Sequence, residues 1–302
     1  MYSNKQVSYY IYFEDFKVIK LNLPKSVSYE SSGCLVFQEN IDLNIYIRYT
    51  PTNASMDKLE IVLKKDVDVN IYMEYTGARF SYIINLSKFD LYKNAKLNIS
   101  QVYKLDSSAV YSSSSYVNLQ EKASLKMFKL FFSGLQVQSS SKVALAYDSD
   151  INIKALLLSK LSQKYIFSCE VLHNEDKSRS RVYSKQVLKD DSTCVFDART
   201  TVQKDTKHCE AYQASHALVL DEGAHIFAKP HLEIYTDELK ASHGSTVGEL
   251  DVDAIAYLNS RGISEKNAKG ILVNAFINEL LDLDYEEAKK SLLRLLGQTD
   301  EE

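Results

Sequence analysis

Apolar and polar side chains alternate along the chain from near the N-terminus to about residue 248. The alternation is clear over residues 59–63 and again over residues 67–73. A period of two places successive side chains on opposite faces of a strand, with one face buried. No stretch of this region keeps a helical period for three turns, and residues 154–163, which come nearest to one, are also predicted as a strand. Further short strands are predicted around Leu97, Leu125, Val143, Ile151, Val195 and Ile226.

These strands recur at uneven spacings. Leu97 and Leu125 are 28 residues apart and Val195 and Ile226 are 31 apart, whereas Leu125 and Val143 are separated by only 18. An approximate repeat of short strands suits a β-solenoid, in which each coil buries its inward side chains on the next. A β-sandwich is also compatible, and the sequence leans only slightly towards the solenoid.

Polar residues supply most of the predicted turns, because the chain has only 9 Gly and 3 Pro. Small serine runs lie at residues 112–115 and 139–141. Ser and other small polar residues favour turns because their side chains hydrogen-bond to nearby backbone. We therefore predict a loop or a solvated sheet face for both runs, rather than a modification site.

Composition narrows the classes of function. Lys and Arg total 36 against 40 Asp and Glu, and the formal net charge of −4 gives no electrostatic footprint for nucleic acid or an anionic membrane. No apolar run approaches the ~18 residues of a transmembrane helix. The first ten residues lack the charged-then-apolar pattern of a secretion signal. We therefore expect a soluble, cytoplasmic protein.

The cysteines and histidines are the candidate soft metal ligands of the chain. No two cysteines form a C-x-x-C pair, so a zinc ribbon or redox dithiol is not expected, and each is predicted to be a small buried hydrophobe. The cysteines are Cys34, Cys169, Cys194 and Cys209. Five of the six histidines lie between residues 208 and 243. For each histidine taken singly, a surface or hydrogen-bonded role is more common than metal ligation.

Two histidine spacings are relevant to metal binding. His208 and Cys209 are adjacent, so in an extended strand they point to opposite faces. His225 and His231 are an even number of residues apart and could share a face, unless Pro230 breaks the strand between them.

An enzyme is an alternative reading. Asp148 and Asp150 lie two residues apart at a predicted strand end, and paired carboxylates can cleave glycosidic bonds, so a β-solenoid polysaccharide lyase or hydrolase is one hypothesis. The chain has no Trp for sugar stacking. It also has no G-x-S-x-G elbow, Walker lysine loop or G-x-G-x-x-G motif.

After Gly248 the pattern becomes helical. Three helices are predicted, over residues 251–259, 264–281 and 284–297. Gly262 suits the position after the first helix, and Ser264 is a good N-cap for the second. Asp284 with Glu287 three residues later is a capping pattern for the third.

The second predicted helix carries apolar residues on more than one face, among them Ile271, Leu272, Val273, Phe276 and Ile277. A helix at the edge of a domain needs only one apolar stripe for its own core. The surplus suggests a packing surface for a partner protein, with coverage by the third helix as an equally good alternative.

Three motifs follow one another with compact spacing. They are KPHLEIY at residues 229–235, SHGSTVG at 242–248 and YLNSRGI at 257–263. Together they strongly resemble the C-terminal signature of the SufB/SufD family of iron–sulfur cluster assembly scaffolds, in the wording of the SufD branch. The resemblance is tight over residues 211–280 and general across the strand-rich region before them.

The resemblance implies a mainly β fold, with a right-handed parallel β-helix core followed by a C-terminal α-helical subdomain. In this chain the two parts correspond to residues 1–248 and 249–302. Family members usually add an N-terminal helical region. Because strands start here almost at once, we expect that region to be missing or much reduced.

The resemblance also implies a scaffold and not a catalyst. SufD-like chains pair with SufB-like chains through their β-helices, and the C-terminal helices of each subunit hold one copy of the ABC-type ATPase SufC. We expect a heterodimer with a SufB-like subunit, or a homodimer of a stand-alone family member. A transient iron–sulfur cluster is expected at the interface, with none bound by the chain alone. The expected ATPase contacts are Leu258, Arg261, Gly262, Ile263, Ile271, Leu272 and Phe276.

His243 falls on the histidine that the SufD pattern places at the cluster-forming interface, and it is the candidate cluster ligand. The pattern usually has Cys two residues earlier, where this chain has Ala241. Ser215 stands where SufB relatives place their key cysteine. A nascent cluster needs mostly thiolate ligands, so the partner is expected to supply the sulfur. Cys209 is a weaker second candidate ligand, with a buried structural cysteine as the alternative.

Overall fold

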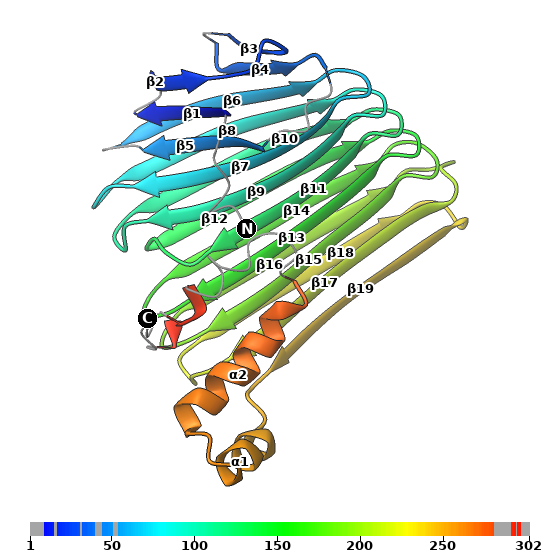
Figure 1. The fold of residues 1–302 in the computed structure, drawn as a ribbon. Coiled ribbons are helices and arrows are strands. Elements are labelled where there is room, and N and C mark those ends of the chain that lie inside the picture. Colours follow the sequence, from blue (N-terminus) through cyan, green and yellow to red (C-terminus); the bar gives the residue numbers. More distant parts are fainter. Residues whose placement is uncertain are drawn as a thin grey trace.

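A computed structural model describes residues 9–14, 17–30, 32–39, 44–50, 54–280, 291–293 and 295–296. Within these residues the chain winds into a parallel β-solenoid, shown in Figure 1. From β4 onwards successive strands alternate between two sheets, and from β6 onwards each pairs in parallel with the strand two places earlier in the chain. The mainly β, parallel solenoid expected from the sequence is confirmed.

The two sheets, called sheet A and sheet B, run the length of the molecule. Antiparallel pairs, β1 with β2 and β3 with β4, lie at their N-terminal ends. Sheet A contains β1 (Tyr9–Glu14), β2 (Lys17–Asn22), β5 (Asn44–Thr50), β7 (Asp68–Gly77), β9 (Lys96–Leu105), β11 (Ser124–Phe131), β13 (Asp150–Ser159), β15 (Arg179–Leu188), β17 (Cys209–Val219) and β19 (Leu239–Gly248). Sheet B contains β3 (Val27–Glu30), β4 (Cys34–Phe37), β6 (Ser55–Leu63), β8 (Tyr82–Leu91), β10 (Val110–Leu119), β12 (Gln136–Leu145), β14 (Lys164–His173), β16 (Thr193–Val202) and β18 (His225–Ile234).

The alternation between sheets explains the uneven spacing in the sequence. Leu97 and Leu125 are register partners on neighbouring strands of sheet A. Val143 follows Leu125 by only 18 residues because it lies on β12, in sheet B. One coil therefore contains two strands, and the longer spacing is the true repeat.

The turns at one side of the solenoid stack on one another with little glycine. Asn94, Lys122, Asp148 and Lys177 all have φ between 52° and 59°, in the left-handed region. Each donates its backbone N–H to a carbonyl of the next coil; that of Asn94, for example, reaches the Glu121 oxygen at 3.0 Å. The ladder of hydrogen bonds offsets the steric cost of this conformation, which Asn and Asp tolerate better than most residues.

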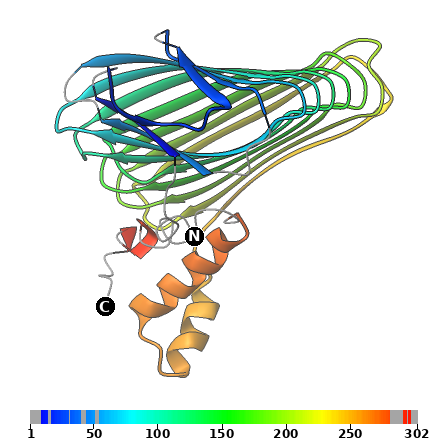
Figure 2. The ribbon, with the colours of Figure 1, turned by 45° about the horizontal axis from the view of Figure 1, so that its top comes forward.

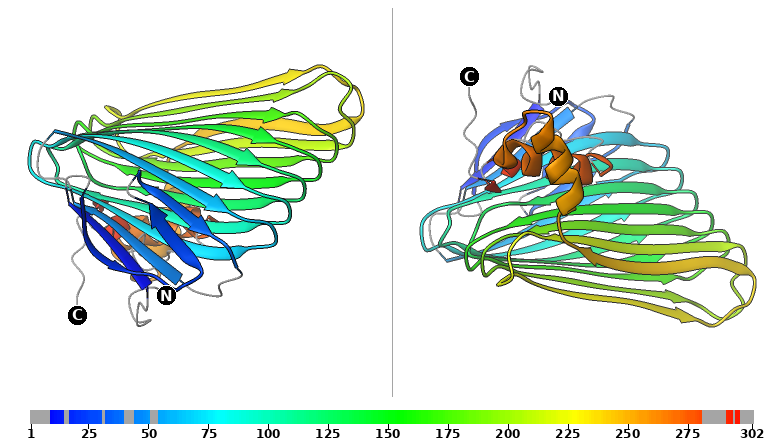
Figure 3. Two further views of the ribbon diagram at one scale, coloured as in Figure 1. Left: turned by 90° about the horizontal axis from the view of Figure 1, so that it is seen from above. Right: turned by 90° about the horizontal axis from the view of Figure 1, so that it is seen from below.

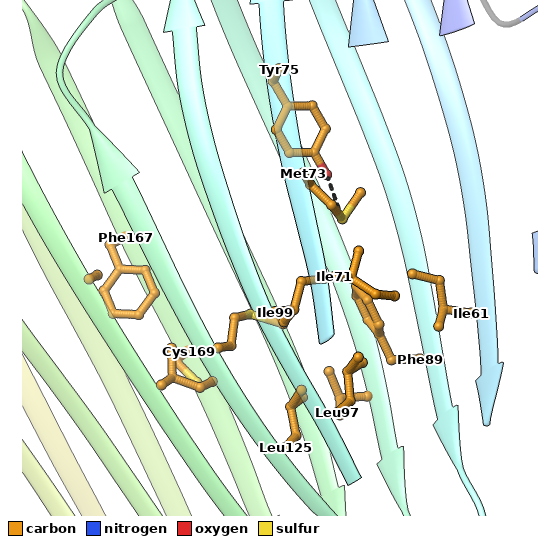
Figure 4. Packing of buried hydrophobic residues seen from close by; sticks show 14 of the residues in the cluster. Ile61, Ile71, Met73, Tyr75, Phe89, Leu97, Ile99, Leu125, Phe167 and Cys169 are labelled. Atoms are coloured by element: carbon orange, nitrogen blue, oxygen red, sulfur yellow. Dashed lines mark hydrogen bonds between the residues drawn. The ribbon is translucent and has the colours of Figure 1, made fainter. Parts of the chain in front are cut away.

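Apolar side chains from both sheets fill the interior, as the sticks in Figure 4 show. An aromatic ladder runs through it along sheet A. Phe13, Tyr49, Tyr75, Tyr103 and Phe131 stack in order, with ring centroids 4.7 to 5.1 Å apart. Offset stacking of this kind adds about 0.5–1.5 kcal/mol per pair beyond the apolar area that is buried.

The serine runs are not loops, and only part of each faces outwards. Ser113 and Ser139, at matched positions of β10 and β12, are buried inside the solenoid with their hydroxyls 3.1 Å apart. Lys129 of β11 is fully buried beside them and donates to Ser139 Oγ at 2.7 Å and to Ser141 Oγ at 3.1 Å. The prediction of a solvated face was wrong for these alternate serines, because a serine-only run shows no apolar phase from which to assign its faces.

Two helices follow β19, and their caps agree with the sequence prediction. Helix α1 (Val252–Ser260) is capped by the Asp251 carboxylate, and Gly262 after it has φ of 85°. Helix α2 (Glu265–Asn278) is capped by Ser264 and ends three residues before the predicted Leu281. Asp284, Glu287 and Gly297, which bound the third predicted helix, lie outside the described residues.

Helix α2 lies across the outer face of sheet A, on one side of the solenoid (Figures 2 and 3). Val273 and Ile277 are fully buried in a cluster with outward-facing residues of the sheet, including Leu156 and Val187. We refer to this cluster, made by outward residues of β7 to β17 with α2, as the outer cluster. No helix in the described part of the chain is both long and apolar enough to cross a membrane.

Candidate functional site at the open end of the solenoid

The C-terminal end of the solenoid is formed by β18 and β19, the last strand of each sheet. Each pairs on one side only, within the described residues. Their side chains are far more exposed than those of the central strands: Phe227, Ile234 and Val247 are 52%, 42% and 58% exposed. An edge of this length with uncovered apolar residues is a template for pairing with another chain.

His243 lies in the middle of β19, on this open end. Its register partner on β17 is Gln213, whose side chain points into the solenoid and is 3% exposed. Register partners on parallel strands share a face, so His243 continues the interior face beyond the last covered coil. The imidazole is therefore exposed at the mouth of the interior.

Gln213 ties the two sheets together directly beneath His243. Its side-chain nitrogen donates to Thr200 Oγ1 at 2.6 Å and to the His231 backbone oxygen at 3.2 Å. These bonds join β17 to β16 and β18, and so fix the floor on which β19 lies.

The two positions at which relatives were expected to carry thiols lie close to His243. Ala241 is half-buried on β19 and packs against a small cluster that contains Cys209 and Ala211. Ser215 is fully buried on β17 and donates to Gln186 Oε1 at 3.3 Å. Neither position offers sulfur to the open end.

Cys209 is fully buried at the start of β17. Its sulfur lies 3.5 Å from Ser178 Oγ and 3.6 Å from the Glu175 carbonyl oxygen, and the Ser178 hydroxyl also contacts His173 Nδ1 at 2.8 Å. In register, Cys209 is four residues from the partner of His243, which corresponds to about 13 Å along the strand. These contacts explain Cys209 as a structural residue, separate from His243.

The other three cysteines are buried as well. Burial raises the pKa of the Cys169 and Cys194 thiols to about 12, which keeps them protonated. The sequence prediction of small buried hydrophobes is thus confirmed for all four cysteines.

The remaining clustered histidines are scattered over the surface. Pro230 does not break β18, and His225 and His231 both point outwards from it, but six residues of strand separate them by about 20 Å. His216 contacts Thr246 Oγ1 at 2.6 Å on the outer face, and His208 forms a turn with φ of 58°. In the described residues no three His, Cys, Asp or Glu side chains gather as a metal site.

Asp148 and Asp150 have an electrostatic explanation. Arg179 contacts Asp148 Oδ1 at 2.9 Å and Asp150 Oδ2 at 3.1 Å, and Arg181 contacts the same Asp150 oxygen at 3.4 Å. The carboxylates are thus held in a network of ion pairs along the coil edge, which accounts for their pairing without catalysis.

The candidate ATPase contacts differ in accessibility. Arg261, Gly262 and Ile271 are exposed, whereas the other four (Leu258, Ile263, Leu272 and Phe276) are partly buried. Phe276 is engaged within the chain, because the Lys185 ammonium lies 4.7 Å from its ring centroid. Val252 and Tyr257 of α1, which are not among the expected contacts, are 74% and 59% exposed.

Comparison with known protein families identifies the family of this chain. A family model described as "SUF system FeS cluster assembly, SufBD core domain" matches residues 46–276. The chain belongs to the SufBD family. The match covers the solenoid from β5 to β19 and most of α2, and it confirms the resemblance drawn from the three motifs.

Individual relatives carry the same family description. The chain is 35% identical over 127 residues to the iron–sulfur cluster assembly protein SufD of Escherichia coli. The aligned segment covers 42% of this chain and 30% of the relative. It is 27% identical over 144 residues to SufD of Bacillus subtilis, covering 47% and 33%. A SufBD family protein of Synechocystis is 36% identical over 98 residues, covering 32% and 22%. The matched parts thus span a third or less of these SufBD relatives.

The three motifs lie on consecutive elements at the C-terminal end of the described chain. Residues 229–235 lie on and just after β18, residues 242–248 lie on β19, and residues 257–263 end α1 and lead into α2. The motifs that carry the SufD resemblance therefore belong to the open end and to the adjoining helices, and not to the body of the solenoid.

Proposed function

We propose that this chain is a SufD-like, non-catalytic scaffold subunit for iron–sulfur cluster assembly. It pairs with a SufB-like subunit through the open end of the solenoid and binds a SufC-like ABC ATPase through α1 and α2. The observation that carries the proposal is the exposed histidine in the centre of an edge strand that pairs on one side only. The names of the SufD relatives support the process, and the geometry of the open end supports the mode of assembly.

The composition of β19 suits strand pairing. Around His243 the strand carries Ala241, Ser242, Gly244 and Ser245, all small, and a Cβ added at Gly244 would meet nothing within 4 Å. Small side chains allow a partner strand to approach closely, and the unpaired backbone groups of the edge supply its hydrogen bonds.

The chemistry of the nascent cluster, which is the cargo of the complex, then divides between the subunits. Iron–sulfur clusters are held mainly by thiolates, with imidazole able to replace some of them. The cysteines of this chain are buried, and His243 is the exposed donor on β19. The proposal therefore assigns one imidazole to this subunit and the thiolates to the SufB-like partner.

Replacing His243 with alanine is expected to impair cluster assembly without preventing subunit pairing. The exposed imidazole makes no hydrogen bond with the described residues, so its removal leaves the strand intact. Loss of one ligand should lower the iron and sulfide retained by the reconstituted complex by at least roughly tenfold. Iron and sulfide analysis, together with light scattering of the complex, measures both quantities.

His231→Ala is the matched control, because His231 is also exposed but points outwards from β18. Unchanged cluster retention in His243→Ala would remove this residue from the site. Light scattering of the isolated chain also distinguishes a homodimer, which would replace the SufB-like partner by a second copy.

For the ATPase, the exposed apolar residues of α1 and α2 are the best test. Tyr257→Ala combined with Ile271→Ala should weaken binding of a SufC-like ATPase at least roughly tenfold, because exposed aromatic residues dominate such interfaces. Deleting residues 249–302 is a poorer test, since it would strip Val273 and Ile277 from the outer cluster and expose its apolar side chains. Calorimetric titration gives the dissociation constants.

Lys269→Ala serves as the control on the same helix, where Lys269 forms an exposed pair with Glu265 at 2.8 Å. Equal affinities for the double variant and the control would place the ATPase elsewhere. Circular dichroism before each titration checks that both variants retain α1 and α2.

A further inference from the structure

A small cavity lies inside the N-terminal part of the solenoid, far from the open end. Its volume is about 20 Å³, and its walls come from both sheets. Tyr49 of β5 lies on the sheet A side, and Ser55, Asp57 and Tyr111 lie on the sheet B side. A cavity needs about 10–15 Å³ by this measure to hold one water molecule, so this one has room for a single molecule of that size.

Three hydroxyl groups that line the cavity make no hydrogen bond of normal geometry to the described residues, although the Tyr111 hydroxyl interacts with that of Tyr75, which also lines the cavity. They belong to Tyr49, Ser55 and Tyr111, and each oxygen is fully buried. The Tyr49 and Tyr111 side chains are 5% and 1% exposed, so bulk water does not reach them. A buried hydroxyl without a partner is costly, and natural proteins rarely leave one unsatisfied. Three such hydroxyls around one cavity point to a single bound molecule that contacts all of them.

The fourth polar group is the Asp57 carboxyl, which is 6% exposed. Asn85 Nδ2 donates to its Oδ2 at 3.3 Å, and no described Lys, Arg or His forms an ion pair with it. Burial raises the pKa of Asp57 to about 7. Below about pH 6 this carboxyl is therefore largely neutral, and its surroundings do not demand a cation.

We propose that the cavity is a binding site for one water molecule, which joins the Tyr49, Ser55 and Tyr111 hydroxyls to the Asp57 carboxyl. A water molecule has two donors and two acceptor sites, and the four groups can use all of them. Each hydroxyl can either donate or accept, so the set is satisfied without strain. The water molecule links β5 to β6 and β10 across the interior. It supplies the hydrogen-bond partners that the buried polar groups of these coils lack, as buried waters do in other proteins.

The sign of a stability change tests this site. If Tyr111 donates to a bound water molecule, Tyr111→Phe removes that hydrogen bond and leaves the water with one partner fewer. The equilibrium constant for unfolding should then rise roughly two- to tenfold. If the cavity is dry, the same substitution removes an unsatisfied hydroxyl and the constant should fall. Tyr49→Phe should behave as Tyr111→Phe does. Urea unfolding at pH 6 measures the constants.

Tyr165→Phe is the matched control. Tyr165 occupies the same register column of sheet B two strands further on, is fully buried, and also has a hydroxyl without a described partner, but it does not line this cavity. Its replacement should leave the unfolding constant unchanged or lower it. A rise for both Tyr49→Phe and Tyr111→Phe with no rise for Tyr165→Phe supports the water site, and no rise for Tyr49→Phe overturns it.

The other guest of suitable size is an alkali ion. An ion would make the stability of the wild-type chain depend on the cation when potassium or sodium chloride is exchanged for choline chloride at one ionic strength. Asp57→Asn would abolish such a dependence. A cation effect that disappears in Asp57→Asn would overturn the water assignment, whereas equal stability in all three salts supports it. Electron density for one solvent atom between the three hydroxyls, in a crystal structure at high resolution, would show the guest directly.

Discussion

Replacing Lys129 with methionine is expected to raise the free energy of unfolding at pH 7 by about 2 kcal/mol. Lys129 is fully buried in the solenoid, where serine hydroxyls take its hydrogen bonds and no described carboxylate pairs with it. Burial lowers the pKa of this lysine to about 8 from its usual value of 10.5. Such a shift represents about 3 kcal/mol of unfavourable burial of the charged form. Methionine has a similar length and removes that cost, less the two hydrogen bonds to serine.

The pH dependence gives the same prediction a second readout. Between about pH 8 and pH 10.5 the unfolded chain keeps a proton on Lys129 that the folded chain has released. The titration of Lys129 therefore makes the wild-type free energy of unfolding rise with pH through this window. Below pH 8 it has no such effect. The difference between Lys129→Met and wild type should shrink as the pH rises from 8 to 10.5. Urea unfolding at pH 7, 8.5 and 10 measures it.

Lys185→Met is the matched control, with the opposite expected sign. Lys185 is 3% exposed on β15, but its ammonium donates to the Phe276 backbone oxygen at the end of α2 and to Glu279 Oε2 at 2.7 Å. Removing it leaves the carbonyl unpaired and weakens the attachment of α2 to sheet A, so a loss of about 1–2 kcal/mol is expected. A loss of stability in Lys129→Met as large as that in Lys185→Met would contradict the account of Lys129.

The fold could be predicted where a strand buries one face only. On β8 and β14 alternate residues are buried, and the apolar period of two follows directly from this. Where α2 covers sheet A, strands bury both faces and the alternation is lost. Leu157 of β13 points inwards and Leu156 and Leu158 point out into the outer cluster, which explains why residues 154–163 come closest to a helical pattern.

The interior polar groups could not be predicted from the sequence for a related reason. Lys129 lies between Phe128 and Leu130, both outward and buried beneath the C-terminal helices, so a local pattern indicates the lysine as the exposed residue of β11. The register with Ser139 across the interior becomes visible only when two strands in different sheets are placed together.

The candidate site was predicted by resemblance alone. Composition showed five clustered histidines without indicating which of them is functional. Only the SHG motif distinguished His243 from the other four. Its accessibility depends on β19 being the last strand of sheet A, a tertiary property. His225 and His231 were correctly predicted to share a face, but that face is the outer one, and a strand spacing cannot show which face looks into the solenoid.

Asp57 provides the second large effect, and it acts in the opposite pH range to Lys129. Burial raises the pKa of Asp57 to about 7 from 3.8, against weaker opposing hydrogen bonds from the Lys58 backbone and Asn85. Between about pH 4 and pH 7 the folded chain therefore keeps a proton that the unfolded chain has lost. By linkage, the wild-type free energy of unfolding falls by up to about 4 kcal/mol as the pH rises through this window. Above pH 7 the titration of Asp57 causes no further change.

Asp57→Asn should remove the falling component, because an amide of the same shape stays neutral and can still accept from Asn85. We expect the variant to match wild type near pH 4.5 and to exceed its free energy of unfolding by about 3 kcal/mol at pH 8. Asp197→Asn, at an exposed aspartate on β16, is the control and should follow wild type throughout. Urea unfolding at pH 4.5, 6 and 8 measures the difference. A gap that stays constant with pH would mean that Asp57 is ionised in the folded chain at all three values, and that its carboxylate has a counter-charge in the cavity.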